Sequence, residues 1–477
     1  MVRRSLSLII AALFVTLPLA ARAQTTPAPA AEQPAAGASA TATVTPPAPA
    51  PEVKKSSGPT FTPYGFILVN AFMNSRALNA GDDPNFATTP GATNDRQILL
   101  SARYNRIGVR IGGMEALGAK VGATMEVDWG AGFPLEQGAN LSQANQAPNF
   151  EFYRPYLRMR LGFATMTWGD ENAKVTLLLG HDYGLVNPLF AVTLGYIGTP
   201  LFQGAGNLYT RSPQVKVTGD FGKDVGLTVA AAVLDPLDQN LQAPLTQQTN
   251  PTISSGDRSR WPQIEGRVAA RGKSGTMGAE VGVSGAYHKE RYLLGTLGAS
   301  TSAASPAFAA NGSWVDLDSA VGGVDAVFKF PFVEVRGEGF LGHNADMYFG
   351  HLGQGGVNVT TTAGPATTGT STLTLTNVRN KRTKGFWVQG IVSPIPMVQL
   401  TGGYGVEVPF AEDIVNTAGN RTRNSNASAG VIVAASKNLK FSAEGVWTFT
   451  ATRPGGTGVT DVRADGYQTA LSAQLTF

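Results

Sequence analysis

The end of the chain, residues 466–477, alternates between two kinds of side chain. Tyr467, Thr469, Leu471, Ala473, Leu475 and Phe477 share one face, whereas Gln468, Ala470, Ser472, Gln474 and Thr476 share the other. Successive residues of a β-strand point to opposite sides. This segment therefore predicts one strand with an apolar side and a polar side.

Alternating segments recur from Phe61 onward, and about sixteen of them approach the length that a tilted membrane-spanning strand needs. The predicted strands are 64–72, 99–111, 119–129, 154–163, 175–181, 214–221, 227–234, 263–271, 279–288, 321–330, 333–341, 384–392, 398–408, 427–435, 439–450 and 466–477.

The connections between these strands alternate in length. Short ones are 222–225, 273–276, 330–332, 394–397 and 437–438, and long ones are 74–95, 131–148, 182–211, 235–260, 292–312 and 347–380. In a membrane barrel the short turns face the periplasm and the long loops face outside. The fold class predicted is all-β, a transmembrane antiparallel β-barrel of about sixteen strands with both ends on the periplasmic side.

A soluble β-sandwich is the alternative, but its strands are shorter and its connections need not alternate in length. Aromatic residues near the strand ends favour the membrane barrel, because they are typical of its interfacial girdles. Examples are Trp129, Tyr287, Tyr404, Trp447, Phe449 and Tyr467.

The N-terminal residues predict export. Arg3 and Arg4 precede an apolar run, and Ala21–Arg22–Ala23 has the small-x-small pattern of a cleavage site. We expect residues 1–23 to be a signal peptide, residues 24–58 to be a Pro/Ala-rich disordered periplasmic segment, and residues 59–477 to form the barrel. Cleavage would remove three arginines and no acid, so the formal net charge falls from +4 to +1, and nothing in it indicates nucleic-acid binding.

The polar faces carry the candidate pore lining, because a charge on the lipid side costs about 2–4 kcal/mol at mid-membrane. The early strands are rich in arginine, whereas the later ones are mixed to acidic, and this asymmetry predicts a modest preference for anions. The charges can also simply pair with one another. The predicted pore-lining residues are Arg106, Arg110, Lys120, Glu126, Asp128, Arg158, Arg160, His181, Asp182, Lys216, Arg267, Arg271, Glu334, Arg336 and Glu338.

The connection 181–211 is long, apolar and poor in charge, which is unusual for a loop in water. A barrel of this size leaves an aqueous channel that its own side chains do not fill. We expect the loop to fold inward and to narrow the channel. The alternative is that it packs on a neighbouring subunit.

These features together resemble the trimeric porin superfamily of Gram-negative outer membranes, and RPYLRMRLGF (154–163) followed by VTLLLGHDYGLVNPLF (175–190) is most similar to the DcaP-like porins. The resemblance implies a homotrimer, an N-terminal periplasmic extension and passage of small organic anions. The terminal Phe477 resembles the signal that the barrel-assembly machinery reads. His181 and Gly184 stand where that family usually has Gln and Ser, and the Pro/Ala-rich extension lacks coiled-coil heptads.

The sequence thus predicts an outer-membrane porin for small hydrophilic solutes, in contact with membrane lipid and lipopolysaccharide. The alternative is a structural or adhesive barrel without an open channel. Four histidines without a nucleophile motif, and the absence of cysteine, argue against an enzyme, a thiolate metal site and a cofactor. Residues 24–58 are too polar to fold as the plug of an energised transporter. The pairs Asp82–Asp83 and Asp316–Asp318 match no EF-hand, and we expect no required metal.

Overall fold

The computed structural model describes residues 58–75, 78–79, 81–88, 96–131, 156–236, 254–297, 308–349, 351–352, 357–363, 371–378, 380–414, 420–454 and 460–477. The predicted signal peptide, the Pro/Ala-rich segment except Gly58, and Arg154 lie outside these residues. Within them, no helix has the length and apolar character of a membrane-spanning helix.

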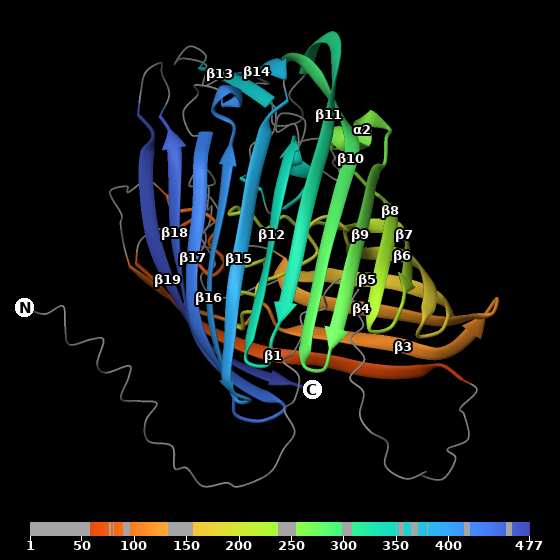
Figure 1. Ribbon diagram of the computed structural model, residues 1–477. Helices are drawn as coiled ribbons and strands as arrows, with labels where there is room; N and C mark the ends of the chain where they lie inside the picture. Colours follow the sequence, from red (N-terminus) through yellow and green to blue (C-terminus); the bar gives the residue numbers. More distant parts are fainter. Residues whose placement is uncertain are drawn as a thin grey trace, which may run out of the picture. The chain divides into compact units, whose positions relative to one another are not determined.

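The described residues form one antiparallel sheet of nineteen strand segments that closes on itself (Figure 1). The segments in the barrel wall are β1 (Thr60–Asn74), β2 (Gln97–Ser101), β3 (Arg106–Ala116), β4 (Ala119–Ala131), β5 (Tyr156–Gly169), β6 (Ala173–Tyr183), β7 (Arg211–Phe221), β8 (Val225–Leu234), β9 (Gln263–Ser274), β10 (Met277–Leu297), β11 (Phe308–Lys329), β12 (Val333–His343), β15 (Arg382–Ile395), β16 (Val398–Pro409), β17 (Asn420–Ala434), β18 (Leu439–Arg453) and β19 (Val462–Thr476).

Sixteen of the described strands make the wall. The segments β2 and β3 both pair with β1 and together form one strand, interrupted at residues 102–105. The hairpin β13 (Val357–Ala363) and β14 (Ser371–Val378) belongs to the connection between β12 and β15. The predicted all-β transmembrane barrel is confirmed, and each of the sixteen predicted strands corresponds to one strand of the wall.

The barrel closes where β1 meets β19. Their register runs from Phe66 opposite Thr476 to Asn74 opposite Gln468. Beyond it, the backbone N–H of Phe477 donates to the carbonyl of Gly65 at 3.0 Å, and the N–H of Gly65 donates back at 3.2 Å. The final strand therefore has a hydrogen-bonded partner on each side.

The two faces of the wall have the predicted character. On β19, Leu471 and Leu475 are exposed on the outside, whereas Gln468, Ser472 and Gln474 are buried inside. Outward apolar and inward polar side chains are what a membrane barrel requires.

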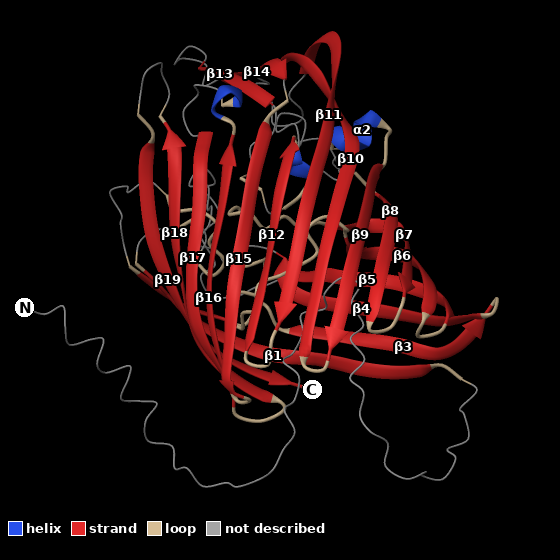
Figure 2. Ribbon diagram, in the orientation of Figure 1, coloured by secondary structure: helices blue, strands red, loops and turns tan. Residues whose placement is uncertain are grey.

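Helices are few and short. The described ones are α2 (Ser255–Ser259), η2 (Ala345–Met347) and η3 (Ala411–Asp413), and Figure 2 shows them at the same end of the barrel as the β13–β14 hairpin. Long connections gather at this end, and tight turns lie at the other.

The long loop expected at residues 292–312 is mostly strand, because β10 and β11 pair as far as Leu297 and Phe308. Alternation of apolar and polar residues marks a strand only where its two faces have different surroundings. A hairpin that continues past the membrane loses that pattern, so the sequence did not reveal it.

Candidate pore constriction

The connection between β6 and β7, residues 184–210, folds into the barrel. Its side chains Leu189, Tyr196 and Phe202 are buried in one cluster with Phe72 and Trp387 from the wall. The rings of Phe202 and Trp387 stack with centroids 5.5 Å apart. The prediction that this apolar loop folds inward is confirmed, and we refer to residues 184–210 as the inward loop.

Polar side chains of β9, β12, β15 and β18, which we call the far wall, form hydrogen bonds with the backbone of the inward loop. One acceptor comes from each of β9, β12, β15 and β18, and each accepts hydrogen bonds from backbone N–H groups, as buried amides require. Glu265 accepts from Leu185, Glu338 from Leu189, Gln389 from Val192 at 2.7 Å, and Glu444 from Leu194 at 3.0 Å and Gly195 at 2.8 Å. The three glutamates therefore anchor the loop and do not line open water.

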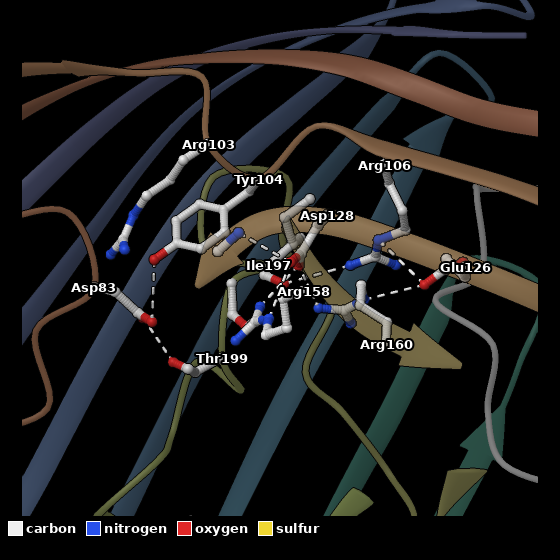
Figure 3. Close-up of polar contacts among 12 residues, drawn as sticks. Asp83, Arg103, Tyr104, Arg106, Glu126, Asp128, Arg158, Arg160, Ile197 and Thr199 are labelled. Atoms are coloured by element: carbon white, nitrogen blue, oxygen red, sulfur yellow. Dashed lines mark hydrogen bonds and ion pairs between the residues drawn. The ribbon is translucent and has the colours of Figure 1, made fainter. Parts of the chain in front are cut away.

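Arginines and two acids form a buried cluster on the opposite wall, on β3, β4 and β5 (Figure 3). Arg158 pairs with Asp128 at 2.7 Å, and Arg160 reaches both Asp128 at 2.9 Å and Glu126 at 3.0 Å. The Nε of Arg106 lies 3.4 Å from Glu126. Strand alternation explains why Arg106, Glu126 and Asp128 all face inward, because residues with even numbers share the inner face in these parts of β3 and β4.

Strand β5 has a β-bulge at Arg160, which faces inward as predicted. Glu126 opposes Leu161 and the next residue, Val127, opposes Met159, so Arg160 is the extra residue. Met159 is 50% exposed on the outside, whereas Leu161 is 4% exposed. In the sequence, Leu157, Met159 and Leu161 alternate with Arg158 and Arg160, which predicts that Leu161 shares the apolar outer face. This prediction was wrong, because a bulge reverses the alternation that follows it.

Arg211, the first residue of β7, is a member of the site that the sequence reasoning missed. Its guanidinium lies 5.6 Å from the ring centre of Tyr183, whose hydroxyl accepts a hydrogen bond from Arg160 at 3.0 Å. Among the described residues its Nη1 is buried without a hydrogen-bond partner, and the ionisable groups nearest to it are Tyr183, Tyr209 and two arginines, not carboxylates. The only sequence signal was a cation directly after a long apolar loop.

A pocket lies between these arginines and the inward loop. Three arginines and no carboxylate line it, so its lining is positively charged. Burial raises the pKa of Tyr209 above its usual range, so this phenol remains a neutral donor. The lining residues are Arg106, Arg160, Tyr183, Phe190, Ile197, Gly198, Thr199, Pro200, Tyr209 and Arg211.

The predicted pair at the start of the loop divides between the two faces. Asp182 is inside, where its carboxylate accepts from the Nζ of Lys216 at 2.6 Å. His181 opposes Gly162 and Pro213, and the alternation of β6 turns it to the outer face. His181 therefore does not line the pore as predicted.

The remaining predicted cations lie elsewhere on the inner wall and are mostly paired. Arg267 contacts Asp325 at 2.5 Å, Arg271 contacts Asp220 at 3.2 Å, and Arg336 contacts Glu334 and the carbonyl of Phe190. Arg110 lies over the ring of Tyr64, 4.1 Å from its centre. Lys120 is exposed beside the turn between β3 and β4. None of these side chains belongs to the arginine cluster.

No model of a known protein family matches the chain, and no curated protein matches its sequence. Among the described residues, no group of three or more His, Asp or Glu side chains is arranged to hold a metal ion.

Solved structures are similar in fold. The outer membrane channel DcaP of Acinetobacter baumannii matches over 89% of this chain and 99% of its own, with 16% identity and a TM-score of 0.58. OmpT, an outer membrane protein of Vibrio cholerae, matches with 11% identity, coverage of 89% and 100%, and a TM-score of 0.49. An anion-selective porin from Comamonas acidovorans has 13% identity, coverage of 88% and 100%, and a TM-score of 0.48. The chain has the fold of a porin-like outer-membrane barrel, and the resemblance seen in its sequence is confirmed at that level.

Proposed function

We propose that this protein is an outer-membrane porin, a passive diffusion channel for small hydrophilic solutes with a modest preference for anions such as organic acids. One observation carries the anion preference. Arg211 faces the constriction with a buried guanidinium nitrogen that has no partner among the described residues, beside three further arginines that share two carboxylates. A buried cation without a partner favours a mobile anion beside it.

The arrangement of the acids supports the same preference. Glu265, Glu338 and Glu444 accept backbone N–H groups of the inward loop, so their charge is screened from solutes. On the arginine side, by contrast, Arg211 has a buried nitrogen without a partner among the described residues, so that side keeps a positive charge that no carboxylate offsets.

Reversal potentials across a planar bilayer, measured in a salt gradient, test the proposal. We expect a potential of the sign for anion preference, and Arg211→Gln should reduce it. Lys223→Gln, an exposed cation in the turn after β7, is the matched control and should leave it unchanged. A clear cation preference of the unmodified protein would overturn the anion assignment.

A structural or adhesive barrel is the second candidate, and the same recording separates the two. A porin conducts without an energy source, whereas a structural barrel remains closed. We also propose that the protein is a channel and no enzyme; hydrolase assays of the purified barrel should detect no turnover.

Topology and assembly complete the proposal. The protein would be a homotrimer, in contact with membrane lipid and lipopolysaccharide, with a cleaved signal peptide and residues 24–58 in the periplasm. The alternation of tight turns and long connections supports this orientation. Light scattering of the detergent-extracted protein would give the subunit number, and protease added to intact cells should cut the long connections and spare residues 24–58.

A further inference from the structure

The described part of the first long connection also lies inside the barrel. Leu78 pairs with Ala87 to close a compact turn. The N–H of Ala87 donates to the hydroxyl of Thr450 on β18 at 2.9 Å, and the carbonyl of Asn85 accepts from Asn424 on β17 at 2.9 Å. We refer to the described residues 78–79 and 81–87 as the first loop. Its contacts with inward side chains of the wall place it inside the barrel.

Two adjacent acids at the tip of the first loop have different partners. Asp82 forms a two-pronged ion pair with Arg103, with both N–O distances at 2.6 Å. Asp83 accepts a hydrogen bond from the hydroxyl of Thr199, in the inward loop, at 2.6 Å (Figure 3). The first loop is thus tied to the wall by one carboxylate and to the inward loop by the next.

Thr199 ends a run of three residues, each of which has one polar group hydrogen-bonded to a side chain outside the inward loop. The carbonyl of Ile197 accepts from Arg106 at 3.5 Å, and the carbonyl of Gly198 accepts from Arg158 at 3.3 Å. Two of the three holding groups are therefore arginines of the cluster, and the third is Asp83.

The ring of Tyr104 packs closely against the inward loop at Gly198. A Cβ added to Gly198 would lie 2.3 Å from the Tyr104 ring, so the loop backbone rests directly on the aromatic face. The hydroxyl of Tyr104 donates to Asp83 at 3.4 Å. Tyr104, Asp83 and Thr199 therefore form one contact between the two loops.

We infer that the first loop is a second constriction element and that Asp83 is a positioning residue, which fixes residues 197–199 against Arg106 and Arg158. Without the Asp83–Thr199 contact, residues 197–199 would be held by two long hydrogen bonds from arginines, and a solute could compete for the same guanidinium groups. With the contact in place, the position of residues 197–199 fixes both the width of the gap and the orientation of Arg106 and Arg158. This inference rests on the proposed channel, but it does not require anion preference.

Cross-linking tests the contact directly. The natural chain contains no cysteine, so Asp83→Cys with Thr199→Cys introduces the only two thiols. Dibromobimane becomes fluorescent when both of its ends react with thiols. We expect fluorescence from this pair in the folded barrel, and none from Asp83→Cys with Ser436→Cys, where the second thiol lies in the turn before β18. Equal labelling of the two pairs, or none in either, would overturn the inference. This readout needs no current, so it is independent of the proposed function.

A double-mutant cycle on single-channel current tests the positioning role. Asp83→Ala and Thr199→Val should each increase the open-channel noise, because each removes the same hydrogen bond. The double variant should show no further increase, since residues that act through one contact are not additive. Asp83→Asn keeps an acceptor for Thr199 and should remain quiet. Full additivity, or unchanged noise in both single variants, would contradict the role assigned to Asp83.

Discussion

The carboxylate of Glu444 on β18 accepts a hydrogen bond from the backbone N–H of Gly195 at 2.8 Å, although the two residues are 249 positions apart. The same carboxylate accepts from the N–H of Leu194 at 3.0 Å and from the hydroxyl of Thr193 at 2.5 Å. One buried side chain thus satisfies three donors at the centre of the inward loop.

We expect Glu444→Ala to loosen this loop. Hydrogen bonds to a charged group contribute about 1.5–3 kcal/mol, and the unpaired N–H groups would add a cost. Single-channel recordings should show larger and noisier currents, and the folded band on gels should be lost at a lower temperature. Glu444→Gln retains one acceptor and should have a smaller effect on both readouts. Equal effects of the two substitutions would mean that the charge, and not the hydrogen bonds, holds the loop.

The arginines of β5 should separate selectivity from stability. Arg160 is buried between Glu126 and Asp128, and removal of one partner from a buried ion pair costs about 3–5 kcal/mol. Arg158 is partly exposed, so its loss should cost less. We expect both Arg158→Ala and Arg160→Ala to reduce anion preference, and Arg160→Ala alone to lower the melting temperature substantially. Unchanged reversal potentials in Arg158→Ala would remove Arg158 from the filter.

Anion preference should increase as the pH falls. Burial raises the pKa of Asp83 to about 6, and nearby Asp82 acts in the same direction, whereas the bond from Thr199 and the charges of Arg103 and Arg158 oppose it. Below that pH the carboxyl is neutral, and the arginines beside it are less compensated.

The raised pKa of Asp83 also makes the stability of the barrel depend on pH. A carboxyl with a raised pKa in the folded state binds its proton more tightly there, so its contribution favours folding at low pH and is lost as the pH rises through about 6.

Reversal potentials test the pH dependence of the anion preference. Measured between about pH 8 and pH 5, they should show a step that is absent in Asp83→Asn. The same step in both proteins would assign the titration to another group.

Gly206 in the inward loop should not tolerate alanine. Its φ is +104°, and an added Cβ would lie 2.3 Å from the carbonyl oxygen of Phe386 on β15. We expect Gly206→Ala to displace the loop and to destabilise the barrel by more than about 1 kcal/mol. Gly402→Ala is the matched control, because a Cβ there would meet only the carbonyl of Ser428 at 3.9 Å. Conductance and melting temperature should change in the first variant alone.

Phe477 should matter for assembly more than for conduction. Its ring is 55% exposed on the outer face, while its backbone joins Gly65 and completes the seam. Phe477→Ala leaves those backbone bonds possible but removes the terminal aromatic. We expect less folded protein in the outer membrane and unchanged single-channel current from the protein that folds. Leu475→Ala, on the same exposed face, should assemble normally. Equal yields of the two variants would argue against a terminal signal.

The wall of this barrel was predictable because lipid imposes a local rule on the sequence. Residues such as Leu471 and Gln468 report their face through their neighbours alone, and that pattern located all sixteen strands. The inward fold of residues 184–210 was predictable for the same reason, since an apolar loop needs cover.

The constriction depended on features without a local signal. The bulge at Arg160 leaves the apolar pattern intact, so Leu161 was assigned to the wrong face. Arg211 and Asp83 acquire their roles from residues far away in sequence, and neither differs from an ordinary loop charge until the chain has folded. His181 was assigned to the pore together with its neighbour Asp182, although successive residues of a strand face opposite sides.

The three glutamates of the far wall lie behind the inward loop. Glu265, Glu338 and Glu444 are carboxyl groups that residues 184–210 cover through backbone hydrogen bonds. Were that segment to swing aside, the widened passage would uncover these acids, and the electrical character of the opening would shift towards cations. Width and ion preference are therefore properties of a single conformational state, and a wide state would admit a different class of solute from a narrow one.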